Sequence, residues 1–405
     1  MATPAPLRLD ELLPRWREVP LYRQTLDGRD LSAPDFSQEF FRLPFITKRE
    51  MREGFPRNFL RAGQRLESLL EQQVVEVEHT SGTSEEQTPV LFRRGWWNEQ
   101  EERALRLNAV AARVLDEFPA ARRATLTTPT CNGSACYTNW MSRSERTFGP
   151  TLFVNLARIP FLLKDHDMAR MADEIGEWAP QFLATDPVHA AWFALYCERR
   201  GLRFPSLKFI LGSYEYVSVV HRKILERVFG VPVFNLYGST ETGHLLMEDE
   251  GGKLRPSSET AFLEIVSPDE AGVGDLVVTT LSNDFMPLVR YRIGDLVERR
   301  GPAYIVHGRA RDALKRADGR RVTTHDIDEC FRETNGIAHY QLRQEENGEA
   351  RLDLIADGAG PESSELNLLV ECVGNVLQLR QPLKVRQVDS LLPAPSGKFR
   401  LTHRD

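Results

Sequence analysis

The stretch Val231-Pro-Val-Phe-Asn-Leu-Tyr-Gly-Ser-Thr-Glu-Thr-Gly243 decides the fold class that we predict for this chain. It begins as a short apolar run with β-branched residues, which is typical of a buried strand. It then changes abruptly to small and polar residues. In open α/β folds, ligands bind at the carboxyl ends of the strands, so the pattern predicts a ligand site at a sheet edge. Taken alone, a strand followed by a polar turn explains the stretch equally well.

The polar end of this stretch carries groups that suit a nucleotide. Tyr237 offers an aromatic face, and Gly238 lets a ligand approach the backbone. Ser239 and Thr240 offer hydroxyls to phosphate oxygens, and Glu241 offers a hard carboxylate suited to Mg²⁺. Three other stretches decide whether this interpretation holds.

Length and composition bound the class of protein. A chain of 405 residues exceeds one typical domain, so two or three domains are expected. The hydrophobic content of 41% is enough for sizeable cores. The net charge is −6 with no block of like charge, which argues against a nucleic-acid or anionic-membrane partner.

The lack of a recognisable targeting signal and the small number of cysteines favour a reduced, cytoplasmic protein. The sequence has no apolar run of membrane-spanning length, and its first residues lack the pattern of a signal peptide. An odd, sparse set of cysteines favours reduced thiols. The set consists of Cys131, Cys136, Cys197, Cys330 and Cys372. A metal site at Cys131 and Cys136 is a minor alternative to buried or free thiols.

Strands and helices alternate before the opening stretch, which predicts a mostly parallel, helix-covered sheet. The expected strands are 123–128, 182–185 and 207–211, and the expected helices are 168–178, 188–201 and 217–229. Upstream, a capping box at Thr47 and Glu50 predicts a short helix, and residues 96–118 predict one longer helix.

After the opening stretch the pattern changes to strands separated by Gly, Pro and Asp turns, which predicts a β-rich subdomain. The expected strands are 262–266, 274–281 and 288–293. Beyond a hinge, helices at 324–334 and 361–378 and strands at 338–342, 351–356 and 384–388 predict a small α+β domain. The fold class is therefore α/β, with a large N-terminal domain, residues 1–307, and a small mobile C-terminal domain, residues 308–405.

A second informative stretch lies in residues 74–92, where two strand-like pieces flank a hydroxyl-rich turn centred on Gly82. Such a loop surrounds an anion with hydroxyls and backbone N–H groups. The loop residues are Thr80, Ser81, Gly82, Thr83 and Ser84. Turns of this composition are common, so the signal is weak by itself.

Two later stretches add charged groups. Arg290-Tyr-Arg-Ile-Gly-Asp295 closes a strand, and its Asp295 supplies a carboxylate that can accept hydrogen bonds from a vicinal diol such as ribose. His307-Gly-Arg-Ala-Arg-Asp-Ala-Leu-Lys315 is dense in charge and suits an exposed hinge. By itself Asp295 would be explained best as a turn aspartate, and a lysine in Ser396-Gly-Lys398 is normally just solvated.

Together these stretches, in this order, resemble the core motifs of the adenylate-forming, acyl/aryl-CoA ligase superfamily. Thr80–Ser84 is similar to its phosphate loop, Tyr237–Glu241 to its nucleotide motif and Met286–Asp295 to its ribose motif. Gly308, Arg309 and Asp312 resemble its hinge, and Ser396-Gly-Lys398 its terminal lysine motif. The phrase Leu43-Pro-Phe-Ile-Thr-Lys48 is similar to one in the phenylacetate–coenzyme A ligase-like branch. The resemblance spans nearly the whole chain.

The resemblance implies a role for each matching residue. Tyr237 would lie against adenine, Thr240 would contact the α-phosphate and Glu241 would hold Mg²⁺. Asp295 would bind the ribose hydroxyls with Arg309 nearby. Lys398 would bridge acid and phosphate during adenylation, and the C-terminal domain would then rotate about the hinge. The implied cofactors are ATP and Mg²⁺, with coenzyme A or a phosphopantetheine as the thiol acceptor.

Departures from the family pattern point to a specialised member. The phosphate loop continues into Glu85 and Glu86 where the family usually has Gly, and carboxylates there would repel a triphosphate. Residues 212–218, Gly-Ser-Tyr-Glu-Tyr-Val-Ser, replace a motif that usually carries Gly before Glu. The aromatic candidates for an acid pocket are Tyr137, Trp140, Tyr214 and Tyr216, and core packing explains them equally well.

The predicted function is therefore activation of an aromatic or other planar carboxylic acid as its acyl-adenylate, followed by transfer to a thiol. Secondary-metabolite biosynthesis is one option for its role. Two alternatives stay open: transfer to a non-thiol acceptor or partner reductase, and a catalytically degenerate homologue that only binds nucleotide or acyl ligand. The expected partners are a small carboxylic acid and, as options, a carrier protein, a reductase or a second copy of the chain.

Overall fold

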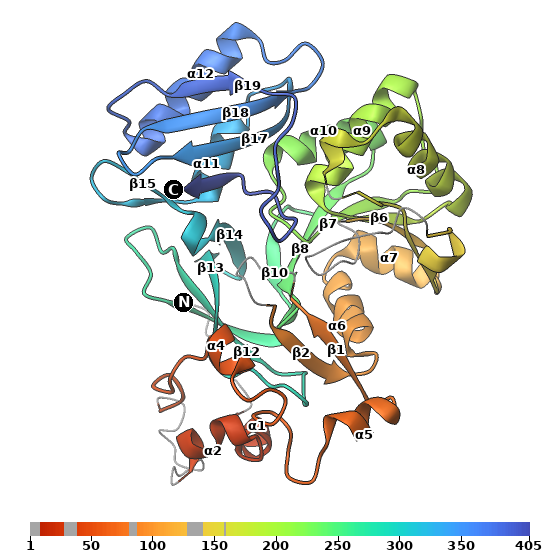
Figure 1. Ribbon diagram of the computed structural model, residues 1–405, viewed down its shortest axis with the longest axis vertical. Helices are drawn as coiled ribbons and strands as arrows, with labels where there is room; N and C mark the ends of the chain where they lie inside the picture. Colours follow the sequence, from red (N-terminus) through yellow and green to blue (C-terminus); the bar gives the residue numbers. More distant parts are fainter. Residues whose placement is uncertain (1–8, 28–38, 81–86, 128–140, 158) are drawn as a thin grey trace. The chain divides into compact units, whose positions relative to one another are not determined.

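The structure is a computed structural model that describes residues 9–27, 39–80, 87–127, 141–157 and 159–405 (Figure 1). The chain divides into two compact units. The first comprises residues 1–107, 237–247 and 253–305, and the second comprises residues 108–236, 248–252 and 306–405. In the part of the chain described, no helix is long and apolar enough to cross a membrane.

The first unit contains mostly antiparallel strands, as the turn-rich sequence predicts. Its strand order is β11-β12-β13-β14-β10-β9, and β11–β12, β12–β13 and β10–β14 pair antiparallel. These strands are β9 Gly243–Glu248, β10 Leu254–Pro256, β11 Ala261–Val266, β12 Gly274–Thr280, β13 Tyr291–Arg300 and β14 Ala303–Arg309. The predicted β-rich subdomain is confirmed.

Helices and one hairpin precede these strands. They are α1 Leu9–Arg17, α2 Pro20–Leu26, α4 Lys48–Arg52, α5 Leu66–Glu71, the hairpin of β1 Val75–His79 with β2 Pro89–Arg93, and α6 Trp96–Leu105. The capping box that opens α4 is confirmed: the Thr47 N–H donates to Glu50 Oε2 at 2.8 Å, and Thr47 Oγ1 accepts from the Arg49 N–H at 3.3 Å.

The second unit contains the predicted parallel sheet. Its strand order is β8-β7-β6-β3-β5-β4, and β3, β5, β6, β7 and β8 pair parallel. The strands are β3 Arg123–Leu126, β4 Thr147–Phe148, β5 Thr151–Phe153, β6 Phe182–Thr185, β7 Phe209–Gly212 and β8 Val233–Ser239. Helices α7 Ala109–Glu117, α8 Asp165–Trp178, α9 Pro187–Arg200 and α10 Val219–Phe229 accompany them.

One predicted helix is wrong. The chain does not form a single helix over 96–118, because α6 ends at Leu105 and α7 begins at Ala109. Asn108 separates them: its backbone is extended, and its side chain accepts hydrogen bonds from the N–H groups of Val110 and Ala111, both at 2.9 Å. The apolar periodicity continues across this break because both helices bury one face.

The C-terminal part of the second unit is α+β, as predicted. Its four-stranded sheet has the order β19-β18-β17-β20, with an antiparallel central pair and parallel outer pairs. Its elements are β15 Leu314–Lys315, β16 Arg321–Val322, α11 Thr324–Asp328, β17 Ile337–Gln344, β18 Ala350–Ala356, α12 Ser363–Leu377, β19 Lys384–Gln387 and β20 Thr402–Arg404. The predicted helix over 324–334 is shorter, because a 3-10 turn over Glu329–Phe331 follows α11.

The segment predicted as an exposed hinge is ordered. Residues 303–309 form β14, the His307 side chain is buried, and His307 Nδ1 lies 3.0 Å from Thr323 Oγ1. Asp312 is buried as well, and its carbonyl accepts a hydrogen bond from the Thr402 hydroxyl at 3.0 Å. Exposure was therefore the wrong expectation for His307 and Asp312, whereas Arg311 and Lys315 are exposed as predicted.

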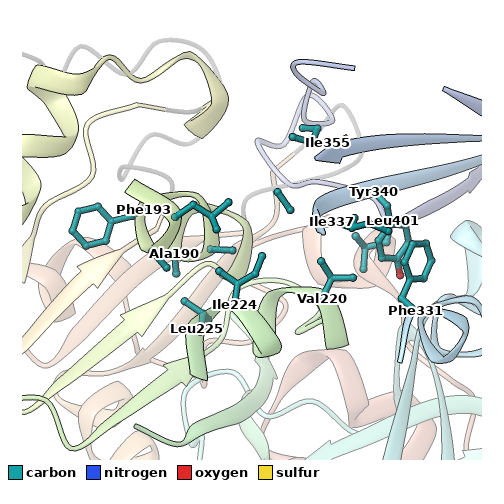
Figure 2. Packing of buried hydrophobic residues seen from close by; sticks show 14 of the residues in the cluster. Ala190, Phe193, Val220, Ile224, Leu225, Phe331, Ile337, Tyr340, Ile355 and Leu401 are labelled. Atoms are coloured by element: carbon teal, nitrogen blue, oxygen red, sulfur yellow. The ribbon is translucent and has the colours of Figure 1, made fainter. Parts of the chain in front are cut away.

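One apolar core runs through the second unit (Figure 2). It includes Ala190 and Phe193 of α9 and Val220, Ile224 and Leu225 of α10, and it continues into Ile337 and Tyr340 of β17. The C-terminal residues therefore pack on the helices that accompany the parallel sheet. The domain boundary at 307/308 stays a prediction, because a division into packed units does not say which segment moves.

Two cysteines contradict the expectation of reduced thiols. Cys330 and Cys372 form a disulfide, with their Cα atoms 5.7 Å apart and a sequence separation of 42. The packing of α12 against the turn after α11 brings them together, which sequence spacing did not indicate. Cys197 is a buried free thiol, while Cys131 and Cys136 lie outside the described residues.

Two histidines join α10 to β17. His221 Nε2 lies 3.0 Å from His339 Nδ1, and the rings stack with centroids 5.2 Å apart. Burial lowers the pKa of His221 to about 4, although the Asp186 charge opposes the shift. Burial and the neighbouring His221 lower the pKa of His339 well below its usual range. Both rings are therefore neutral when folded.

We expect this pair to make the second unit acid-sensitive. Because the folded pKa is depressed, the stabilisation is present above the unfolded pKa of His and is lost as pH falls through the folded value. Replacing His221 by Gln should remove part of that dependence, on the order of 3 kcal/mol between pH 7 and pH 4. Urea unfolding at both pH values measures it, with exposed His166→Gln as the control. An equal acid loss in wild type and His221→Gln would contradict the account.

Candidate active site

The nucleotide-like motif lies in the first unit, where β8 ends and β9 begins. The Tyr237 hydroxyl donates a hydrogen bond to Asp295 Oδ2 at 2.5 Å. Asp295 is a buried residue of β13, 58 residues further along the chain. The fold thus brings together the residues predicted to contact adenine and ribose.

Glu241 follows in the turn between these strands and is an ionised, buried carboxylate. Its Oε1 lies 3.1 Å from Lys48 Nζ and accepts a hydrogen bond from the Tyr291 hydroxyl at 3.0 Å. Burial raises the pKa of Glu241, but the Lys48 charge and several hydrogen bonds lower it more, so the net shift is downward. The carboxylate is therefore charged, and Lys48 is its cationic partner.

Lys48 is a residue that sequence reasoning missed. The phrase Leu43–Lys48 lies along β13 because the Ile46 N–H donates to Arg290 O at 3.2 Å and the Arg292 N–H donates to Ile46 O at 2.9 Å. This pairing carries Lys48 to Glu241. The available signal was the lysine at the end of Leu43–Lys48, a phrase that is similar to one in the resembling branch.

Arg290 fixes that phrase from the other side. Its guanidinium donates to the carbonyl oxygens of Phe41 and Leu43, both at 2.5 Å, and pairs with Glu264 at 2.9 Å. Its backbone has φ 53°, in the left-handed region that non-glycine residues rarely adopt. Arg290 therefore supports the site by holding its scaffold.

The structure describes only some of the hydroxyl-bearing residues that were predicted to contact phosphate. Ser239 Oγ lies 3.0 Å from Thr242 Oγ1, and Thr240 sits in the turn before Glu241. Thr80 is buried at the end of β1, where its Oγ1 accepts from the Thr88 N–H at 3.1 Å. The rest of the predicted phosphate loop (Ser81, Gly82, Thr83, Ser84) and Glu85 and Glu86 lie outside the described residues.

The predicted lysine and acid-pocket residues belong to the second unit. Lys398 Nζ donates to the Tyr214 carbonyl at 2.7 Å, and the Phe399 N–H donates to Glu215 Oε1 at 2.9 Å. Tyr214 is 46% exposed, whereas the Tyr216 hydroxyl lies 3.2 Å from His325 Nδ1. Arg309 is partly buried at the end of β14. Tyr137 and Trp140 lie outside the described residues.

Glu241 is the candidate ligand for a metal ion at this site. Among the described residues, no group of three or more His, Cys, Asp and Glu side chains could hold an ion. A single ionised carboxylate such as Glu241 nevertheless fits Mg²⁺, which commonly takes one or two protein carboxylates together with substrate phosphates. The residues present therefore suit Mg²⁺ brought with a nucleotide.

Gly238 has no room for a side chain. A Cβ at this position would collide with the carbonyl oxygen of Gly243 and lie 2.8 Å from His244 Cα, both of which are backbone atoms. We expect Gly238→Ala to lower the free energy of unfolding by about 1–3 kcal/mol because the backbone must move. Urea unfolding tests this against Gly374→Ala in α12, where an added Cβ meets nothing within 4 Å. Equal stability of the two variants would show that the turn is not closely packed.

Comparison with solved structures defines the fold. The chain matches a 2-hydroxyisobutyryl-CoA ligase in its postadenylation state with a TM-score of 0.67 and 17% identity, covering 100% of this chain and 90% of that one. It matches an anthranilate CoA ligase bound to anthranoyl-AMP with a TM-score of 0.57 and 14% identity, covering 80% and 65%. The fold is that of the adenylate-forming CoA ligases. No protein-family model matches the sequence.

Sequence comparison finds relatives with the same kind of name. The chain is 26% identical over 297 residues to a phenylacetate–coenzyme A ligase of Thermus thermophilus and 25% identical over 299 residues to that of Pseudomonas putida. Each match covers 69% of this chain, and the chain spans 61% and 62% of the length of these relatives. A shorter match, 29% over 111 residues (27% of this chain, 24% of the relative), is to protein CapK of Staphylococcus aureus. Over about two thirds of its length the chain is therefore similar in sequence to phenylacetate–coenzyme A ligases.

Proposed function

We propose that this protein activates a carboxylic acid with ATP and then transfers the acyl group to a thiol. In the first step a carboxylate oxygen attacks the α-phosphorus of ATP, and pyrophosphate leaves. In the second, the thiol sulfur attacks the acyl carbon, AMP leaves and the thiol proton passes to solvent. The observation that carries the proposal is the grouping of Tyr237, Asp295 and an ionised Glu241 in one unit.

The residues of the first unit would bind and orient the nucleotide. Asp295 would accept hydrogen bonds from the ribose hydroxyls, and Tyr237, fixed by its bond to Asp295, would present its ring to adenine. Glu241 would hold Mg²⁺, which supplies charge neutralisation for the phosphates. Lys48 pairs with Glu241 at 3.1 Å, so it would keep the buried carboxylate compensated before the nucleotide arrives.

The residues of the second unit would act on the acid. Lys398 would bring a point charge to the carboxylate and the α-phosphate, where the developing charge needs cations. The exposed Tyr214 beside it favours an aromatic or other planar acid, together with Tyr216, Tyr137 and Trp140. Coenzyme A or a carrier-protein phosphopantetheine would be the acceptor, and residues 308–405 would move between the two steps.

A thioester assay tests the complete reaction. The protein is incubated with ATP, Mg²⁺, a panel of aryl, fatty and amino acids, and either coenzyme A or a phosphopantetheine-bearing carrier protein. We expect acid-dependent AMP release with a thioester detectable by mass spectrometry. Adenylate without a thioester would favour a non-thiol acceptor or a partner reductase. ATP binding without either product would favour a degenerate, ligand-binding homologue.

A further inference from the structure

Two acids of the second unit meet where the parallel strands end, and the proposed function uses neither of them. Asp186 follows β6 and Glu215 follows β7, and these strands pair with Thr185 opposite Gly212. The Ser213 N–H donates to Thr185 O at 2.9 Å, which extends the pairing by one residue. The two carboxyl groups therefore reach the same edge of the sheet.

Asp186 caps the N-terminus of α9. Its Oδ1 accepts from the N–H groups of Val188 at 2.9 Å and His189 at 3.3 Å, and His189 Nδ1 lies 3.3 Å away. Burial by itself raises the pKa of Asp186. The His189 charge and the hydrogen bonds lower it by more than burial raises it, so the net shift is downward and the carboxylate stays ionised. It presents a fixed negative charge to its neighbour.

The Asp186 charge disfavours ionisation of Glu215. Burial and the Asp186 carboxylate raise the pKa of Glu215 well above its usual range, and Lys398 and the Phe399 N–H oppose the shift only in part. The side-chain interaction with Asp186 also favours the protonated form of Glu215 and so raises its pKa. A neutral carboxyl group can donate to Asp186 with one oxygen and accept from a backbone N–H with the other.

The acceptor oxygen of Glu215 binds the terminal lysine motif. The Phe399 N–H donates to Glu215 Oε1 at 2.9 Å, and the preceding residue, Lys398, donates to Tyr214 O at 2.7 Å. Lys398 and Phe399 of the C-terminal segment are thus hydrogen-bonded to Tyr214 and Glu215, which follow β7. The Phe399 ring anchors the segment further, with its centroid 5.5 Å from that of Phe161 and 5.4 Å from that of His339.

The backbone at Tyr214 is shaped for this contact. Tyr214 has φ 70°, which is in the left-handed region. This conformation is energetically unfavourable for a bulky residue and is found mainly where function or the surrounding structure requires it. The family resemblance places a glycine here, and the observed φ is the one that glycine adopts freely. This chain keeps the conformation with a tyrosine, whose carbonyl receives Lys398.

We infer that Glu215 is a positioning residue for the terminal lysine motif: it fixes the Phe399 amide and thereby sets where Lys398 can reach. The inference deepens the proposed function, because Lys398 matters only if the protein forms an adenylate. It requires that residue 215 offer an acceptor to Phe399 and a donor to Asp186 at the same time. Glutamine meets that requirement, whereas alanine and the shorter aspartate do not.

Three variants of the full chain test this, with Glu226→Ala on the exposed side of α10 as the matched control. Hydrogen–deuterium exchange at the Phe399 amide is the direct readout. We expect Glu215→Ala to speed that exchange about tenfold, the worth of one hydrogen bond, and Glu215→Gln to keep the wild-type rate. Glu215→Asp, whose shorter side chain withdraws the carboxyl group from the Phe399 amide, should behave like Glu215→Ala. It serves as the test variant if Glu215→Ala does not fold.

Adenylation kinetics supply the second readout. Glu215→Ala should lower kcat about tenfold and leave KM for ATP nearly unchanged, because Tyr237, Glu241 and Asp295 belong to the other unit. Glu215→Gln should restore kcat. Unchanged Phe399 protection in Glu215→Ala, or equal loss in Glu215→Gln, overturns the inference. If the wild-type protein adenylates no acid, the proposed function fails, while the amide measurement still decides whether Glu215 holds the segment.

Discussion

Lys398→Ala should lower the rate of adenylate formation about 100- to 1,000-fold while leaving ATP affinity nearly unchanged. The reason is that a positioned cation at the developing charge acts mainly on the transition state, whereas the predicted nucleotide contacts come from Tyr237, Glu241 and Asp295. Truncation at 398 removes the bond to Tyr214 O but leaves the Phe399 amide on Glu215. The segment should therefore stay folded.

Acid-dependent adenylation and ATP calorimetry measure the two quantities separately. Lys384→Ala is the matched control, because Lys384 is an exposed lysine of the same unit that pairs only with Glu349 at the edge of the C-terminal sheet. Wild-type adenylation in Lys398→Ala would remove this lysine from the reaction. A large loss of ATP affinity would instead assign it to nucleotide binding.

Glu241→Gln should produce the second large effect, a fall of about 100-fold or more in adenylation together with a weakened dependence on Mg²⁺. The substitution removes the negative charge that would hold the ion and keeps the shape of the side chain. The amide oxygen can still accept from the Tyr291 hydroxyl, and Lys48, whose side chain is 29% exposed, can turn to solvent. Stability should change much less than activity.

The readouts are adenylation as a function of Mg²⁺ concentration and thermal unfolding. Glu259→Gln is the control, since Glu259 is an exposed carboxylate of the same unit whose partner is Arg103. An unchanged Mg²⁺ profile in Glu241→Gln would show that another group holds the ion. A collapse of stability would mean that the Lys48–Glu241 pair is primarily structural.

Much of the fold follows from local patterns. The alternation of apolar strands and capped helices before Leu236 predicts the parallel sheet, and the turn-rich sequence after Gly243 predicts antiparallel strands. The break at Asn108 escaped prediction because apolar periodicity runs through it, and a helix cap is visible only when the backbone is seen to extend. The Cys330–Cys372 disulfide likewise depends on tertiary packing of α12, which no local pattern encodes.

The candidate site likewise contains residues that a local motif predicts and residues that only the tertiary structure reveals. Tyr237 and Asp295 could be predicted as partners because each stands in a recognisable motif on a strand, and they are hydrogen-bonded. Lys48 and Glu215 could not. Lys48 reaches Glu241 only through the pairing of Ile46 with β13, and Glu215 acquires its partners from the ends of neighbouring strands and from the C-terminal segment.

The central claim is that this chain joins a carboxylic acid to AMP. Acid-dependent exchange of labelled pyrophosphate into ATP, run with Mg²⁺ over aryl, fatty and amino acids, tests it most directly because it needs no acceptor. We expect exchange with one class of acid, strongest for aryl acids, and none without acid. Measurable ATP binding with no exchange for any acid would contradict the claim.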